Sequence, residues 1–205
     1  MDPRLPYALG ALAGLARADA AHSDTLEASD GHGCEVTTSA MAVALQLLRA
    51  PGEDCTTHSG TQLPTTASAD ARLMCAIPVG TALSTVDLEA FAETVWRVCG
   101  CTSRNEFQSA ALLAAAVSIG INTRIRTRPL SYIDPLWDAV DVVSAMTPRG
   151  ETDSSPDVLE VAQRTLKAVA NTQSDLRSSP APVLQETLSD CAPSSRIVPL
   201  AFFLA

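Results

Sequence analysis

Signals that start helices recur along this sequence, and they constrain its fold more than any other feature. A hydroxyl residue followed three positions later by an acidic residue is the pattern of a capping box. This pattern occurs at 84–87, with Ser and Asp, and at 103–106, with Ser and Glu. An Asp or Ser followed by proline, which pairs an N-cap with a proline at the first helical position, occurs at 134–135 and 155–156. No stretch shows the sustained apolar–polar alternation of a strand. The sequence therefore predicts an all-α fold, with a loop over 51–69 and helices over 5–21, 41–48, from the 84–87 box to about 98, 107–121, 136–146, 158–170 and 182–188.

Length and charge narrow the classes of protein. The chain has 205 residues, 46% of them apolar, which suits one domain over residues 1–205 with a sizeable core. Fourteen basic residues stand against 23 acidic ones, a formal net charge of -9. Nucleic-acid binding and docking on anionic lipid both need a basic face, so we expect neither partner. Aromatic residues make up only 4%, which disfavours stacking platforms for single strands.

The cysteines and the N-terminus bear on the compartment. No apolar run reaches the roughly 18 residues that a membrane span needs. Residues 5–16 are weakly apolar, but two glycines dilute them and Arg17 interrupts their end, so a buried first helix is favoured over a secretory signal. Six cysteines are too dilute for a disulfide scaffold. We expect a cytoplasmic protein with free thiols.

Lys167 is the only lysine among the 14 basic residues. This bias, together with the many alanines, suggests a bacterial source.

Two clusters of cysteine and histidine side chains could bind a metal ion or take part in redox chemistry. His32 and Cys34 lie in one predicted loop and Cys55 and His58 in the next, so these four could form a tetrahedral zinc site or simply be loop residues. The Cys-x-Cys pair at 99–101 could be redox-active or a structural pair beside a C-cap glycine, and the structural role is favoured. The sequence has no nucleophile elbow and no phosphate-binding glycine loop.

Five segments, in consistent order, resemble the ADP-ribosylglycohydrolase family. Residues 10–20 resemble its opening helix, which typically has the pattern G-x-x-x-G-x-A-x-G-D-A, and residues 36–42 stand where the family has T-D-D-T-x-M. Residues 69–80 are similar to its G-N-G-x-x-M-R-x-x-P-x-G element. Residues 100–112 look like its T-H motif with the alanine-rich helix that follows, and residues 198–202 resemble a late helix. The resemblance implies a single-domain orthogonal helical bundle of the ADP-ribosylglycohydrolase type.

The resemblance also implies which chemistry is missing. The family cleaves a glycosidic bond to ADP-ribose with two magnesium ions held by carboxylates, and magnesium requires hard oxygen ligands. Thr37 and Thr38 match the family's aspartate pair, Cys75 matches its M-R arginine and Ser103 its T-H histidine. The later G-G-D-T-D-T segment has no counterpart in the sequence. We therefore expect no metal site, no cofactor and no ADP-ribosyl hydrolase activity.

What remains on this interpretation is a pocket for a small molecule. Its expected lining is Thr37, Thr38, Met74, Cys75 and Ser103, which is neutral and thiol-bearing and suits an apolar ligand. The acids nearest the altered motifs, which would carry any acid–base chemistry, are Asp19, Glu35 and Asp70.

Three functions follow from this pocket. The first is a pseudoenzyme that binds a ligand or a partner. The second is a repurposed, metal-independent cyclase, isomerase or dehydratase in a bacterial biosynthetic pathway, and the third keeps ADP-ribosyl hydrolysis with unusual ligands. Apolar residues over 197–204 would be left uncovered without the family's last helices, so we expect a homodimer or a partner protein through this C-terminal segment.

Overall fold

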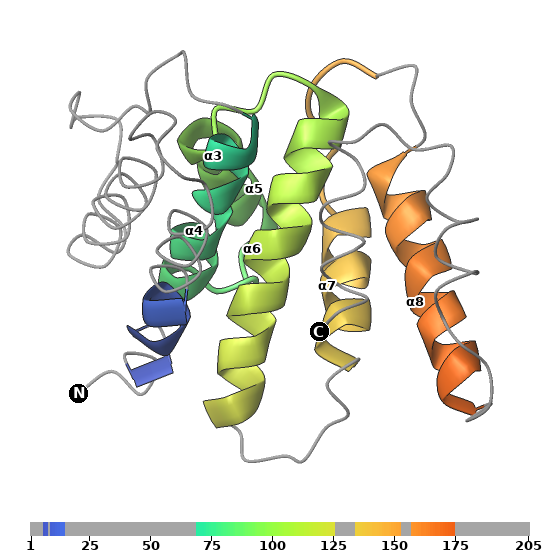
Figure 1. Ribbon diagram of the computed structural model, residues 1–205. Coiled ribbons are helices and arrows are strands. Elements are labelled where there is room, and N and C mark those ends of the chain that lie inside the picture. Colours follow the sequence, from blue (N-terminus) through green and yellow to red (C-terminus); the bar gives the residue numbers. More distant parts are fainter. Residues whose placement is uncertain (1–5, 8, 15–68, 126–133, 153–156, 175–205) are drawn as a thin grey trace, which may run out of the picture.

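The computed structural model describes residues 6–7, 9–14, 69–125, 134–152 and 157–174. Within these ranges the chain is mostly helical and has no strand (Figure 1), so the all-α prediction is confirmed for this part. Residues 6–7 and 9–14 are helical, within the predicted 5–21 helix. The predicted helices over 41–48 and 182–188 lie outside the described residues. The labelled helices are α3 (Ala69–Met74), α4 (Ala76–Ala82), α5 (Leu88–Val98), α6 (Arg104–Ile125), α7 (Asp134–Ser144) and α8 (Val158–Ser174).

Helix α5 ends at Val98 as predicted, but it begins later than the 84–87 pattern indicates. Its N-cap is Asp87, and not Ser84. The backbone of Asp87 is extended, and its carboxylate accepts a hydrogen bond from the Ala90 amide at 3.0 Å. The prediction of a box that starts at Ser84 is therefore wrong. The reason is that an aspartate is itself a strong N-cap, so the acid expected at the third helical position takes the capping role.

Helices α3 and α4 were not expected, because the 69–82 stretch has weak helical signals. The short α4 contains both Pro78 and Gly80, residues that usually argue against a helix. Pro78 is the third residue of α4, where a missing amide hydrogen costs no intrahelical bond. The helix is stabilised by packing, since Val79 and Gly80 are buried.

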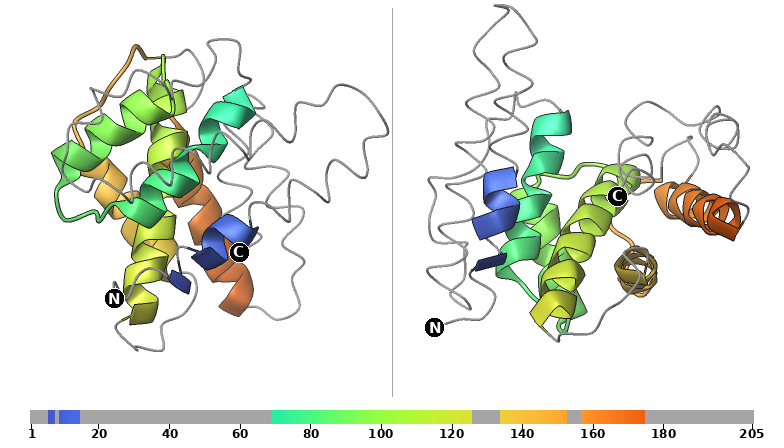
Figure 2. Two further views of the ribbon diagram at one scale, coloured as in Figure 1. Left: turned by 90° about the vertical axis from the view of Figure 1, so that its left-hand side faces the viewer. Right: turned by 60° about the horizontal axis from the view of Figure 1, so that its bottom comes forward.

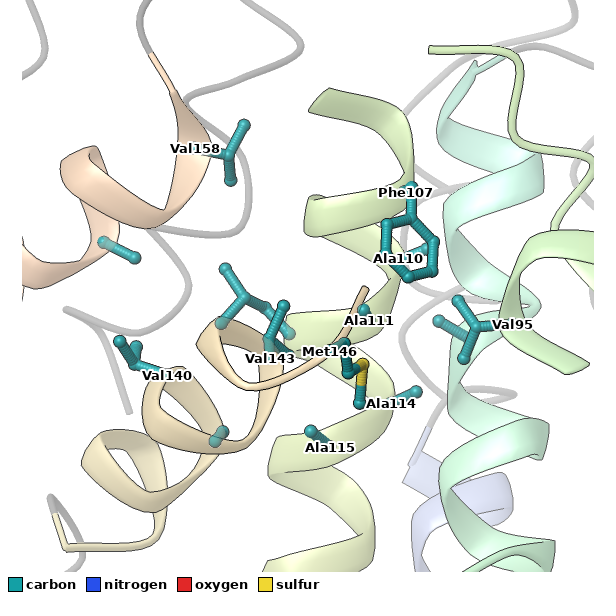
Figure 3. Packing of buried hydrophobic residues seen from close by; sticks show 14 of the residues in the cluster. Val95, Phe107, Ala110, Ala111, Ala114, Ala115, Val140, Val143, Met146 and Val158 are labelled. Atoms are coloured by element: carbon teal, nitrogen blue, oxygen red, sulfur yellow. The ribbon is translucent and has the colours of Figure 1, made fainter. Parts of the chain in front are cut away.

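Helix α6 is the centre of the fold, with α4 and α5 on one side and α7 and then α8 on the other (Figures 1 and 2). An alanine-rich helix that is buried on most sides is typical of such a position. In the close view, Val143 and Met146 lie toward α6 beside Ala111 and Ala115, while Val95 of α5 lies on the side of Phe107 (Figure 3). All of these residues belong to one hydrophobic cluster.

Small residues set the spacing between α4 and α6. A Cβ atom on Gly80 would lie 2.3 Å from the carbonyl oxygen of Ala114 and 2.9 Å from the Cβ of Val117. The two helices therefore approach each other at a point where only glycine fits. This contact fixes α4 against the middle of the central helix. Among the described residues, no helix is both long and apolar enough to cross a bilayer.

Candidate functional site

Four of the eight predicted site residues fall in the part of the chain that the structure describes. Asp70 and Met74 lie in α3, Cys75 lies between α3 and α4, and Ser103 immediately precedes α6. The other four, which are the candidate acids and hydroxyls of the N-terminal motifs, lie outside the described residues: Asp19, Glu35, Thr37 and Thr38.

The structure brings the 69–80 and 100–106 segments together through one ion pair. The guanidinium of Arg72 in α3 donates from Nη2 to Oε1 of Glu106 in α6 at 2.8 Å, and both side chains are partly buried. We call the surrounding residues, Arg72, Cys75, Ser103 and Glu106, the α3–α6 junction. Two segments that the family resemblance places in one site are thus neighbours in space.

Ser103 caps the central helix. Its hydroxyl oxygen accepts from the Glu106 amide at 3.3 Å. The Glu106 carboxylate reaches back one residue further than a standard capping box and accepts at Oε2 from both the amide and the hydroxyl of Thr102, each at 2.8 Å. The predicted 103–106 box is therefore present in a shifted form, and the hydroxyl that matches the family's histidine is used to start α6.

Glu106 is held in its charged form. Partial burial on its own raises the pKa of this carboxyl. The hydrogen bonds from the Thr102 amide and hydroxyl, the positive charge of Arg72 and the hydrogen bond from the Ser103 amide outweigh burial. The pKa therefore lies below its ordinary value of 4.5. A carboxylate with four stabilising partners and a lowered pKa is a poor proton donor at neutral pH. Glu106 therefore organises the junction and is not suited to acid catalysis.

Cys75 is fully buried, and its thiol lies in the hydrophobic cluster. Burial raises the pKa of this thiol from 9.0 to about 11. Because the thiolate is the reactive form, a thiol with this pKa is a weak nucleophile at neutral pH. Met74 beside it is only partly buried.

The connection between α7 and α8 also contacts the start of α6. The Glu151 carbonyl accepts from the Arg104 amide at 3.0 Å, which satisfies one of the orphan donors at the helix start. Gly150 has a φ of 86°, and a Cβ there would lie 2.7 Å from the carbonyl carbon of Ser103. Nearby, Arg149 pairs with Glu89 and Glu93 of α5.

The buried side chain of Gln108 joins α6 to the beginning of α8. Its Oε1 accepts from the Val158 amide at 3.2 Å, and its Nε2 donates to Oδ2 of Asp157 at 3.1 Å. Asp157 also accepts from the Leu159 amide at Oδ1 at 2.9 Å and pairs with Arg104 at 3.3 Å. The polar groups around the start of α6 thus connect α3, the α7–α8 connection and the start of α8 to the central helix.

Sequence reasoning located Ser103 and Glu106 by their spacing but missed Arg72, Gln108 and Asp157. The Ser155-Pro156 pair predicts the start of α8, and Asp157 lies directly after it. An aspartate next to a predicted helix start is a signal that could have identified its contact with the Leu159 amide. The contacts of Asp157 with Arg104 and Gln108 of α6 could not have been found from the sequence, because these residues are distant along the chain.

Metal ligands are a further class of functional side chain that the described residues could supply. No three histidine, cysteine or acidic side chains among them are arranged to hold a metal ion. The four residues named as possible zinc ligands lie outside the described residues, so the zinc site and the simpler interpretation as loop residues both stay hypotheses: His32, Cys34, Cys55 and His58.

Comparison with family models, with curated protein sequences and with solved structures found no match to this chain. The likeness to ADP-ribosylglycohydrolases therefore rests on the five segments quoted above and on their order.

Proposed function

We propose that this chain is an ADP-ribosylglycohydrolase-like pseudoenzyme, a helical protein of that bundle type that binds a small apolar ligand or a partner protein and does not hydrolyse ADP-ribosyl bonds. Residues 1–205 form one domain in this proposal, in the cytoplasm of a bacterium.

The proposal rests on the structural roles of Ser103 and Cys75, the two described residues that match the family's histidine and arginine. The Ser103 hydroxyl accepts the Glu106 amide and so belongs to the start of α6. Cys75 carries no positive charge at any pH and is fully buried. Both positions therefore support the fold, and neither has a cationic side chain that could pair with a phosphate group.

The same contacts disfavour the alternative of a repurposed enzyme that uses this junction. A nucleophilic thiol needs a lowered pKa, whereas the pKa of Cys75 is raised to about 11. Glu106 is paired with Arg72 and Thr102. Acid–base chemistry would then rest on Asp19, Glu35 or Asp70.

An activity assay tests the first half of the proposal. The purified full chain is incubated with ADP-ribosylated arginine, with and without magnesium or manganese, beside an active ADP-ribosylarginine hydrolase. We expect no release of ADP-ribose from this chain under either condition. Metal-dependent release would overturn the proposal.

A binding assay tests the second half. The neutral fluorescent dye Nile red serves as an apolar probe, and we expect saturable binding that Met74→Arg weakens by tenfold or more. The matched control is Val86→Arg, which introduces the same charge at a side chain that is 91% exposed in the α4–α5 turn. Equal binding by the wild type and Met74→Arg would remove the pocket from the proposal.

A further inference from the structure

Residues 147–151, which lie between α7 and α8, form a strap across the start of α6 (Figure 1). Glu151 forms an isolated parallel bridge with Ser103, and its carbonyl accepts from the Arg104 amide at 3.0 Å. A Cβ on Gly150 would lie 2.7 Å from the Ser103 carbonyl carbon and 2.8 Å from the Arg104 nitrogen. The strap therefore lies directly on the backbone of Ser103, a member of the α3–α6 junction.

Arg149 holds the strap against α5. Its guanidinium pairs with Glu89 and Glu93, which are four residues apart on one face of that helix. Two carboxylates at this spacing repel each other, so a cation between them is favoured. The Glu89 and Glu93 side chains are nevertheless 68% and 51% exposed. Ion pairs of this kind contribute little and are screened by salt, so the attachment is weak and reversible.

The closed strap also leaves one hydrogen-bond donor unused. Nε of Arg149 is buried and has no hydrogen-bond partner among the described residues. A buried donor without a partner is unfavourable, whereas water can reach this nitrogen once the side chain leaves α5. Release of Arg149 therefore recovers part of what is lost with its two ion pairs.

We propose that residues 147–151 are a gate over the Ser103 side of the α3–α6 junction, which Arg149 holds closed and which opens as a unit while the helices stay folded. Met146 is buried in the hydrophobic cluster and anchors the end of the strap that follows α7. What the gate admits, the apolar ligand of the pocket, rests on the proposed function, whereas the opening itself needs no ligand.

Amide hydrogen exchange in the full chain, resolved by residue with NMR, tests the opening. The Arg104 amide is the reporter, because the first residue of α6 has no intrahelical acceptor and its amide bonds to the Glu151 carbonyl of the strap. We expect Arg149→Gln to speed this exchange by tenfold or more. The Phe107 amide, which bonds to the Ser103 carbonyl in the first turn of α6, should exchange as in the wild type. High salt should speed the Arg104 amide in the wild type and have little effect in the variant.

A second variant opens the gate without a change of charge. Gly150 has a φ of 86° and no room for a Cβ beside α6, so Gly150→Ala should speed exchange of the Arg104 amide as well. The matched control is Arg164→Gln, which removes an arginine from the 3.7 Å pair with Glu160 on the exposed surface of α8 and should leave that amide unchanged.

Three results would overturn the gate. The first is unchanged exchange of the Arg104 amide in Arg149→Gln. The second is an equal acceleration of the Phe107 amide, which would mean that the start of α6 unfolds with the strap. The third is the same acceleration in Arg164→Gln, which would mean that the loss of any surface arginine suffices.

Stopped-flow fluorescence with Nile red tests access through the gate. Arg149→Gln should raise the association and dissociation rates by about the same factor and leave Kd unchanged, because a gate changes the path to the pocket and not the bound state. Unchanged rates in a variant whose Arg104 amide exchanges faster would overturn the role in access. No binding by the wild type would instead refute the pocket of the proposed function, a failure that the ligand-free exchange experiment separates from a failure of the strap.

Discussion

Arg72 and Glu106 are 34 positions apart in sequence and form an ion pair of 2.8 Å between α3 and α6. The same carboxylate accepts from the Thr102 amide and hydroxyl. One side chain therefore closes the start of the central helix and fastens a neighbouring helix to it. Because its charged form has several partners, its contribution depends on pH.

Replacing Glu106 by Gln should destabilise the protein at pH 7 and have little effect in acid. The folded-state pKa of Glu106 lies below the ordinary value of 4.5, so its contribution is present above about pH 4.5 and is lost as the pH falls through the folded value. We expect Glu106→Gln to lower the free energy of unfolding by about 1–2 kcal/mol at pH 7, the usual range for a helix cap with a charge-assisted hydrogen bond. Urea denaturation between pH 3 and pH 7 measures the difference.

Glu160→Gln is the matched control for this experiment. Glu160 forms a 3.7 Å pair with Arg164 on the exposed surface of α8, and such i,i+4 pairs contribute only about 0.3–0.5 kcal/mol. A Glu106→Gln variant whose destabilisation is the same at pH 3 and pH 7 would contradict the role assigned to the carboxylate charge.

The start of α6 shows what local sequence can and cannot specify. The spacing of Ser103 and Glu106 is a three-residue pattern, and it predicts the helix start before any tertiary contact is known. The pairing with Arg72 depends on how α3 packs, which no local pattern encodes. For the same reason the sequence predicted α5 through α8 but missed α3 and α4, whose helical state depends on burial against α6.

The candidate site was predictable only in part. The family resemblance selected Cys75 and Ser103, and the Arg72–Glu106 pair does bring their segments together. Pattern matching could not show that the Ser103 hydroxyl caps a helix or that the Cys75 thiol is buried, since both facts depend on side-chain packing.

Replacing Gly80 by Ala should destabilise the contact between α4 and α6. The added Cβ would lie 2.3 Å from the Ala114 carbonyl oxygen, which is backbone and cannot move aside cheaply. We expect a loss of about 1–3 kcal/mol, the usual cost of overpacking, seen as a lower midpoint in thermal or urea unfolding.

Gly120→Ala in α6 is the control for that substitution. A Cβ on Gly120 meets nothing within 4 Å, so the variant should gain about 0.5–1 kcal/mol from helix propensity. If Gly80→Ala were as stable as Gly120→Ala, the close approach of the two helices would be wrong.

Replacing Gln108 by Met should weaken the attachment of α8. Methionine keeps most of the volume but leaves the buried Val158 amide without its acceptor, and an unsatisfied buried donor costs about 1–3 kcal/mol. Amide hydrogen exchange should show the largest loss of protection at the start of α8. The half-buried Gln163 gives the control variant Gln163→Met, and equal losses in the two variants would argue against the specific role of Gln108.

The apolar C-terminal segment should mediate self-association. If residues 197–204 cover each other in a homodimer, Phe202→Asp will shift the species in multi-angle light scattering from dimer to monomer, because a carboxylate is costly to bury. Tyr7→Asp, at a side chain that is 41% exposed, is the control and should leave the dimer intact. A single monomeric species of the wild type at high micromolar concentration would contradict this prediction.

Cys75 should react far more slowly in the folded protein than in the unfolded one. With its pKa raised from 9.0 to about 11, the thiolate fraction near pH 8 is about one hundredth of the ordinary value, and the thiolate is the form that reacts. Pulse labelling with iodoacetamide at pH 8, followed by peptide mass mapping, measures the rate at this residue. Labelling in 6 M guanidinium gives the unfolded reference for the same cysteine, so differences between reagents and sites cancel. We expect the folded rate to be lower by a factor of one hundred or more, because burial restricts access in addition to lowering the thiolate fraction. Equal rates in the two states would mean that Cys75 is accessible, and its place in the hydrophobic cluster would then be wrong.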